Sequence, residues 1–184
     1  MSSGSALLVI DMQRGFDDAR WGVRNNPHAE ANGLRLLAHW RAQGWPVVIV
    51  RHDSTNPKST LRPGQPGNDF KPGFEPLPGE LTVRKHVNSA LIGTPLEAWL
   101  RERGITAVTV FGITTDQCVS TTVRMASNLG FETTLVEDAC ACFGQVTPDG
   151  APMSAQALHL AHITTLNTEF ARVVRTDSIV DSPV

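Results

Sequence analysis

The chain has 184 residues, of which 41% are hydrophobic, and its formal net charge at pH 7 is -2. This size predicts one domain over residues 1–184 with a sizeable core, and the weak charge excludes a basic surface for nucleic acid or an anionic membrane. Three cysteines do not make a disulfide framework and favour a reducing compartment. The first apolar run, 7–10, has no basic flank and is too short for a signal peptide or a membrane span, so we expect a cytoplasmic protein.

Strand and helix patterns alternate along the chain. The segments 6–10 and 46–50 predict buried strands, and the apolar run 107–111 predicts another strand. Further strands are predicted at 81–84, 132–137 and 171–175. Helical spacing and end signals predict helices from about 26 to 44, at 95–103, from about 118 to 130, and at 155–168. This alternation predicts an α/β protein, a three-layer α/β/α Rossmann-like fold with a mostly parallel six-stranded sheet. In such sheets ligands bind beyond the carboxyl ends of the strands, where the strand order reverses.

The segment 56–79 differs in kind from the rest, because it holds six of the chain's 12 prolines and four glycines. A long irregular segment inside a compact domain is either disordered or a functional loop. Phe70 and Phe74 favour the second interpretation, because both can dock against the domain. We therefore expect this segment to form a lid or a wall over a binding site.

Cys118 follows the fourth predicted strand, at the start of the next helix. Unpaired backbone N–H groups and the helix dipole stabilise a thiolate there, so this place favours a reactive cysteine. The alternative is a small buried cysteine that only packs. Asp116 lies two residues earlier, and since its charge near the sulfur would raise the thiol pKa, we expect it to turn away and cap the helix.

Two further polar residues are expected near Cys118. Asp11 follows the first strand, and the usual doubly wound order places that strand beside the fourth one, across the same crevice. Lys85 leaves the third strand at its carboxyl end and can reach the same rim. Taken singly, Asp11 could cap a helix and Lys85 could be a solvated surface charge. Their shared placement is what predicts a site.

Three motifs carry a family resemblance. The residues 8–13 read Leu-Val-Ile-Asp-Met-Gln, the segment 83–96 contains Val-Arg-Lys-His and Ser-Ala-Leu-Ile-Gly-Thr-Pro-Leu, and 112–119 read Gly-Ile-Thr-Thr-Asp-Gln-Cys-Val. Together they resemble the signature blocks of the isochorismatase-like cysteine hydrolases, and the similarity runs from about residue 6 to 139. With a cysteine at 118, the resemblance is to the metal-independent amidohydrolase branch rather than to members that cleave the vinyl ether of isochorismate.

The resemblance implies a catalytic triad of Asp11, Lys85 and Cys118. It also implies a cis peptide between Ile113 and Thr114, which directs the backbone N–H groups of Thr114 and Cys118 into an oxyanion hole. The implied reaction is hydrolysis of an amide, imide or carbamoyl C–N bond of a small molecule through a thioester intermediate. Relatives of this kind are dimers or tetramers, so we expect a homodimer or homotetramer.

No cofactor and no metal are expected. Nicotinamidase-like members bind a metal through an Asp-x-His pair and a later histidine, whereas the corresponding segment here reads Arg51-His52-Asp53 with no second histidine before His86. His159 and His162 lie on the helix 155–168, which is expected to lie far from the crevice, so we expect them to be packed or solvated. Cys140 and Cys142 are expected to be buried thiols that only pack.

The substrate site is expected to draw on residues near the three motifs. Aromatic or apolar side chains would form its walls and polar ones would donate or accept hydrogen bonds, with ordinary packing as the alternative for each. The candidates are Gln13, Phe16, Trp21, Phe70, Ile113, Thr115 and Gln117. Three other functions stay open: a catalytically silent small-molecule-binding member of the same fold, a metal-assisted amidase, and a flavodoxin-like or nucleotide-binding domain. The last lacks the glycine-rich phosphate motifs.

Overall fold

The computed structural model describes residues 5–181 and contains a central sheet of six strands in the order β3-β2-β1-β4-β5-β8. All five neighbouring pairs are parallel, so the predicted α/β architecture is confirmed. The bounds of the six strands are β1 Ser5–Ile10, β2 Val47–His52, β3 Leu81–Lys85, β4 Ala107–Gly112, β5 Glu132–Val136 and β8 Arg172–Val174. The order reverses between β1 and β4, because the chain builds outward from β1 on one side and from β4 on the other.

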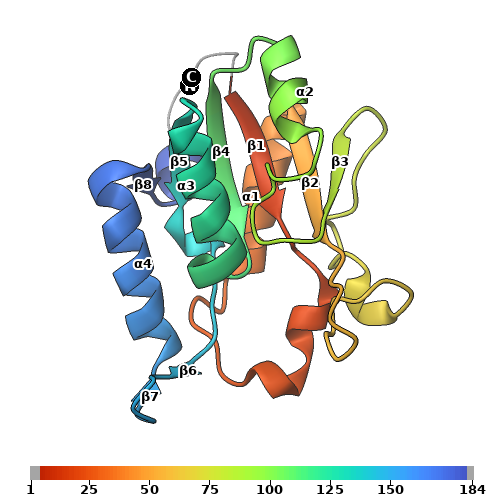
Figure 1. Cartoon of the computed structure of the whole chain (residues 1–184). Helices are drawn as coiled ribbons and strands as arrows, with labels where there is room; N and C mark the ends of the chain where they lie inside the picture. Colours follow the sequence, from red (N-terminus) through yellow and green to blue (C-terminus); the bar gives the residue numbers. More distant parts are fainter. Residues whose placement is uncertain (1–4, 182–184) are drawn as a thin grey trace.

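Helices cover both faces of this sheet and bury its central strands (Figure 1). Every residue of β1 is buried, which explains why its sequence is a continuous apolar run rather than an alternating one. The helix α1 packs with α5 on one face, and α2, α3 and α4 lie on the other face (Figure 1). Their bounds are α1 Ala29–Ala42, α2 Leu96–Glu102, α3 Ser120–Asn128, α4 Ala155–Glu169 and α5 Asp177–Val180. Among residues 5–181, no helix has the length and apolarity that crossing a membrane requires.

Two regions are more structured than the sequence predicts. The helix expected to begin near Cys118 begins instead as a π-helix, η4 Thr115–Val119, which continues into α3. The segment 138–153, expected to be a loop, contains part of a 3-10 turn, η5 Glu137–Ala139, and a hairpin of β6 Gln145–Val146 and β7 Pro152–Met153. Three further 3-10 turns are η1 Arg14–Asp17, η2 Ala19–Trp21 and η3 Pro66–Asn68.

The proline-rich segment 56–79 is irregular apart from η3, as expected, and it packs tightly on the domain. Phe74 is fully buried, and Leu61 is 6% exposed. The buried Asn68 amide donates hydrogen bonds to the Leu61 carbonyl oxygen and to the Asp53 carboxylate. Several apolar and polar anchors therefore fix this segment against the ends of the strands.

A cluster of four charged side chains joins this segment to α1 and to the chain after β1. Arg24 and Glu30 form a two-pronged ion pair, with one of its hydrogen bonds at 2.6 Å. The buried Lys71 ammonium contacts Asp17 and lies 3.2 Å from Glu30. Burial by itself would raise the pKa of Glu30, but Arg24 and Lys71 outweigh it and lower the pKa from 4.5 to about 2.

We predict that Glu30→Gln destabilises the protein in a pH-dependent way. The pKa of Glu30 is lower in the folded state than in the unfolded chain, so its contribution to stability is present above about pH 4.5 and is lost as the pH falls toward 2. Because the pair is partly exposed, we expect a loss of about 1 kcal/mol in the free energy of unfolding at neutral pH. Denaturant titrations at about pH 7 and about pH 3 measure it. The exposed Glu102→Gln is the control, and a deficit that persists undiminished at the lower pH contradicts the prediction.

Candidate active site

Three predicted residues lie at or just beyond the carboxyl ends of β1, β3 and β4. Asp11 follows β1 directly, Lys85 is the last residue of β3, and Cys118 lies in η4 after β4. Because all the strands are parallel, these ends meet at one edge of the sheet. Asp11 has a φ of 52°, a left-handed conformation that is uncommon for a residue with a side chain. The chain therefore turns sharply where β1 ends, at the point where the strand order reverses.

The Lys85 ammonium joins the other two side chains. Its Nζ lies 2.7 Å from Asp11 Oδ2 and 3.3 Å from Cys118 Sγ. Asp11 is 0% exposed, Lys85 1% and Cys118 7%. Oδ1 of Asp11 has no hydrogen-bond donor among the residues that the structure describes. A buried, incompletely satisfied carboxylate beside a buried ammonium is costly for stability, and such groups are typical of functional sites.

The same ammonium has two more acceptors. It lies 2.9 Å from His52 Nδ1 and 3.2 Å from the Val87 carbonyl oxygen. Burial, followed by the charge of Lys85, lowers the pKa of His52 below its usual range, so its imidazole is neutral. This contact was not predicted, because the sequence indicated His52 only as a possible metal ligand. The available signal was its place at the end of β2, the strand between β1 and β3.

Cys118 is held as a thiol. Burial raises its pKa most, and the negative charge of Asp11 raises it further, whereas Lys85 opposes both. The expectation that a helix start stabilises a thiolate is therefore wrong for the resting protein, because the loss of hydration outweighs the helix dipole. An acidic group and a base are thus placed together: a thiol carries the proton, and a carboxylate lies within 4.8 Å to receive it.

The backbone before Cys118 runs through a cis peptide between Ile113 and Thr114. Gly112 precedes it with a φ of 145°, and a Cβ there would lie only 2.0 Å from the Ile10 carbonyl oxygen, so no larger residue fits between β1 and β4. In the part of the chain that the structure describes, no acceptor bonds the Thr114 N–H. Cys118 lies in the first turn of the helix, where N–H groups lack intrahelical partners.

A cavity of about 170 Å³ opens beside the sulfur atom. The segment after β2 contributes Ser54, Asn56, Ser59 and Leu61 to its lining. The other lining residues are Phe16, Trp21, His52, Asn88, Thr114, Gln117 and Cys118. The ring centroids of Phe16 and Trp21 are 5.1 Å apart, so together they form one aromatic wall. The proline-rich segment is thus a packed wall of this cavity.

The structure brings three of the seven expected substrate residues to this cavity, namely Phe16, Trp21 and Gln117. The other four are corrected, because their side chains are engaged elsewhere. Gln13 bonds the backbone N–H and carbonyl oxygen of His52, and the Phe70 ring lies under the Arg51 guanidinium. Ile113 is fully buried, and the Thr115 hydroxyl bonds His159 Nδ1 at 2.9 Å.

The helix α4 is closer to the site than expected. His159 of α4 is 1% exposed, and its contact with Thr115 joins α4 to η4, so the expectation of a distant helix is wrong. Asp116 does not cap the helix, since the cap position is Thr114, and its carboxylate instead accepts a hydrogen bond of 3.4 Å from Gln145. Cys140 and Cys142 are both fully buried, as expected for packed thiols.

The residues that the structure describes include one group of possible metal ligands, Asp11, His52 and Cys118, whose ligand atoms lie within 4.8 Å of one another. Lys85 Nζ contacts all three of these side chains. A charged ammonium among the donors repels a divalent cation, so this arrangement fits the lysine better than a metal ion.

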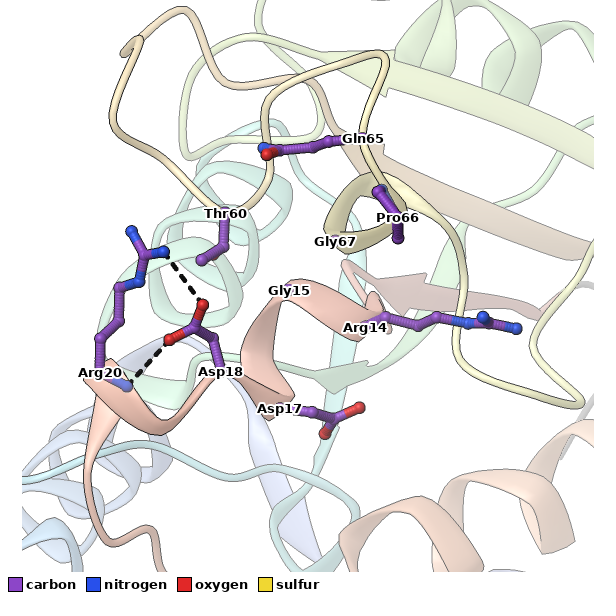
Figure 2. A pocket seen from close by; sticks show the side chains of 9 residues that line it. All are labelled: Arg14, Gly15, Asp17, Asp18, Arg20, Thr60, Gln65, Pro66 and Gly67. Carbon is purple, nitrogen blue, oxygen red and sulfur yellow. Dashed lines mark hydrogen bonds and ion pairs between the residues drawn. The ribbon is translucent and has the colours of Figure 1, made fainter.

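A second cavity, of about 350 Å³, is lined by residues of the same segment that carries Phe16 and Trp21, among them Arg14, Asp17 and Arg20 (Figure 2). Its walls are η1, η2 and the loop around Gly67, where a Cβ would lie 2.2 Å from the Thr60 carbonyl oxygen. Figure 2 shows that Asp18 and Arg20 pair with each other at its rim. At Gly15 of η1 a Cβ would lie only 2.8 Å from the Gly67 carbonyl oxygen and 2.9 Å from that of Thr60, so the segment that carries the aromatic wall packs closely against the proline-rich segment.

The sequence matches the family model of the isochorismatase domain over residues 5–178. The chain belongs to the isochorismatase family. It is 41% identical to the uncharacterised isochorismatase family protein YrdC of Bacillus subtilis, over 98% of this chain and 97% of the relative. A solved structure of an isochorismatase family protein from Chromobacterium violaceum has 47% identity and a TM-score of 0.94, over 98% of this chain and 93% of that one.

A relative whose name states an activity is the ureidoacrylate amidohydrolase RutB of Variovorax paradoxus. It is 27% identical to this chain, and the match covers 98% of this chain and 82% of the relative. The family membership predicted from the three sequence motifs is thus confirmed over nearly the whole chain.

We predict that Lys85→Met destabilises the protein strongly, because it leaves the Asp11 carboxylate buried without its counter-ion. The expected loss in the free energy of unfolding is about 3–5 kcal/mol. Adding Asp11→Asn is expected to recover a large part of it, since the uncompensated charge is then removed. Denaturant unfolding of both variants measures the coupling. The exposed Lys58→Met is the control, and a Lys85→Met protein as stable as the wild type contradicts the ion pair.

Proposed function

We propose that this isochorismatase-family protein is a cysteine-dependent hydrolase that cleaves a C–N bond of a small amide, imide or carbamoyl compound through a thioester. The observation that carries this proposal is the single ammonium of Lys85 in contact with both Asp11 and Cys118 at the floor of a small cavity. The name of the relative RutB, an amidohydrolase, supports the same reaction class.

In the first half of the reaction, Asp11 takes the proton of the Cys118 thiol as the sulfur attacks the substrate carbonyl carbon. The raised pKa of this thiol makes the transfer unfavourable at rest, so it is expected to coincide with attack. Lys85 keeps a positive charge beside both groups, which stabilises the thiolate while the carboxylate is neutralised. The cost of forming a free thiolate is thereby avoided.

The tetrahedral intermediate carries its charge on the former carbonyl oxygen. We propose that the N–H groups of Thr114 and Cys118 bind this oxygen, since both residues line the cavity. A donor of this kind is commonly worth about 2.7–4 kcal/mol. Asp11 then returns its proton to the leaving nitrogen, and the C–N bond breaks to leave a thioester.

In the second half, a water molecule replaces the amine product. Asp11, now a carboxylate again, takes a proton from the water as it attacks the thioester carbonyl carbon. The C–S bond breaks, the acid product leaves, and the proton returns to the Cys118 sulfur. Acid, amine and the starting thiol are thus accounted for without an added cofactor.

We predict that Cys118→Ala abolishes turnover. In a screen of small amides by ammonia release, one or more should be hydrolysed by the wild type, and the variant should lose roughly 10⁴-fold or more in kcat/KM. Asp11→Asn should lose a similar factor, because the thiol has no base. The mass of intact wild-type protein quenched during turnover should include the acyl adduct, and digestion should place this adduct on the peptide that contains Cys118.

Turnover that survives Cys118→Ala removes the cysteine mechanism. Turnover that requires added metal and is lost on chelation indicates a metal-assisted amidase instead. Binding without turnover indicates a catalytically silent member of the fold. The matched control is Cys142→Ala, because this second buried thiol bonds the Ala155 carbonyl oxygen and does not line the cavity.

A further inference from the structure

His52 occupies an unusual position for a histidine, because its ring contacts a buried ammonium. Lys85 Nζ has three hydrogens and four acceptors within reach, namely Asp11, His52, Val87 and Cys118. The contact with His52 Nδ1, at 2.9 Å, is the second shortest of the four. An ammonium is only a donor, so His52 Nδ1 must be the acceptor and carries no hydrogen.

A neutral imidazole without a hydrogen on Nδ1 carries it on Nε2. No described residue bonds Nε2, and His52 lines the active-site cavity. The ring therefore presents an unused N–H donor to whatever occupies the cavity. Its backbone is fixed by the Gln13 amide, which accepts from the His52 N–H at 2.8 Å and donates to its carbonyl oxygen at 3.2 Å.

The charged groups around this ring favour the neutral form. Burial lowers the pKa of His52 most, followed by Lys85, with a smaller contribution from His86. Asp11 and Asp53 act in the opposite direction but are outweighed. The fixed donor is therefore retained at neutral pH and is altered only when the ring gains a second proton, which places two cations side by side.

The side chains that line the cavity offer no counter-ion to a charged ligand. With His52 neutral and Cys118 a thiol, none of the described residues that line it carries a formal charge. The nearest charges, Asp11 and Lys85, are paired with each other at 2.7 Å. A substrate carboxylate would thus lose its hydration without gaining a counter-ion, which is unfavourable.

We propose that His52 is a specificity-determining residue that donates its Nε2–H to a second carbonyl of an uncharged substrate, whose first carbonyl is attacked by Cys118. The substrate class is a small neutral dicarbonyl amide or imide. This proposal rests on the proposed hydrolase function for the identity of the attacked carbonyl. The tautomer and the preference for neutral ligands do not depend on turnover.

The first test is the state of the ring. In protein labelled with ¹⁵N, the ring nitrogen shifts of His52 should show Nδ1 without a hydrogen and Nε2 with one at neutral pH. Its titration should lie below the range of an ordinary histidine, and Lys85→Met should move it upward. The exposed His28 is the control, and Lys85→Met should leave its ring nitrogen shifts unchanged. A ring protonated at Nδ1, or doubly protonated at neutral pH, overturns the proposal.

The second test is binding to Cys118→Ala, which cannot turn over by the proposed mechanism. The probes are succinimide with two carbonyl groups, 2-pyrrolidinone with one, and the anion succinamate. Succinimide should bind about tenfold more tightly than 2-pyrrolidinone, as expected for one added hydrogen bond, and succinamate should bind weakest. Adding His52→Asn, whose side-chain oxygen can still accept from Lys85, should remove the difference between the two neutral probes, whereas adding His28→Asn should not.

The outcomes separate the two proposals. If no amide is hydrolysed but succinimide binding depends on His52, the hydrolase function fails and the assignment of His52 stands. If amides are hydrolysed through Cys118 but His52→Asn leaves the relative affinities unchanged, the assignment of His52 fails alone. Tighter binding of succinamate than of succinimide also overturns it. In a hydrolysing protein, His52→Asn should raise KM for dicarbonyl substrates about tenfold and leave kcat within a few-fold.

Discussion

The buried pair of Asp11 and Lys85 is the interaction on which the site depends. Two opposite charges with essentially no exposed surface lie 2.7 Å apart at the end of the sheet. Such a pair contributes little net stability, because the loss of hydration offsets the attraction. The pair instead fixes the position of the Lys85 ammonium, because removing either partner leaves the other charge uncompensated. In this position the ammonium also contacts Cys118 and His52.

The surrounding loops hold this arrangement in place. Gln13 bonds the backbone of His52, and Asn68 reaches the same carbonyl oxygen at 3.1 Å, so β1, β2 and the proline-rich segment are linked beside the ion pair. On the other side, the contact between Thr115 and His159 fixes the turn that carries Cys118. These buried polar side chains do not face the cavity, and their role is to orient those that do.

The state of Cys118 shows how two electrostatic effects compare at one atom. The helix start favours a thiolate by roughly 0.3–1 kcal/mol, a small effect compared with that of burying a charge. Burial and the adjacent Asp11 charge together raise the thiol pKa. A carboxylate beside the thiol is then an advantage, because it provides a base that receives the proton without the need for a free thiolate.

Much of the architecture could be predicted from the sequence. The buried central strand β1 is a continuous apolar run, and all six predicted strands lie within two residues of the observed bounds at each end. The approximate meeting of Asp11, Lys85 and Cys118 followed from their places after strands one, three and four, since parallel strands end at a common edge. The family resemblance added the cis peptide, which no local pattern of residue types encodes.

Only the tertiary structure decided the directions of the side chains. Gln13, Ile113 and Thr115 follow strand ends more closely than Phe16 and Trp21 do, yet they bond or pack elsewhere. Phe70, in the proline-rich segment, also packs elsewhere. The position of a residue after a strand does not determine which rotamer its side chain adopts or which neighbouring group it contacts. His52 is the clearest case: its sequence context excluded a metal motif, whereas its neutral state and its contact with Lys85 depend on three strands meeting at one edge.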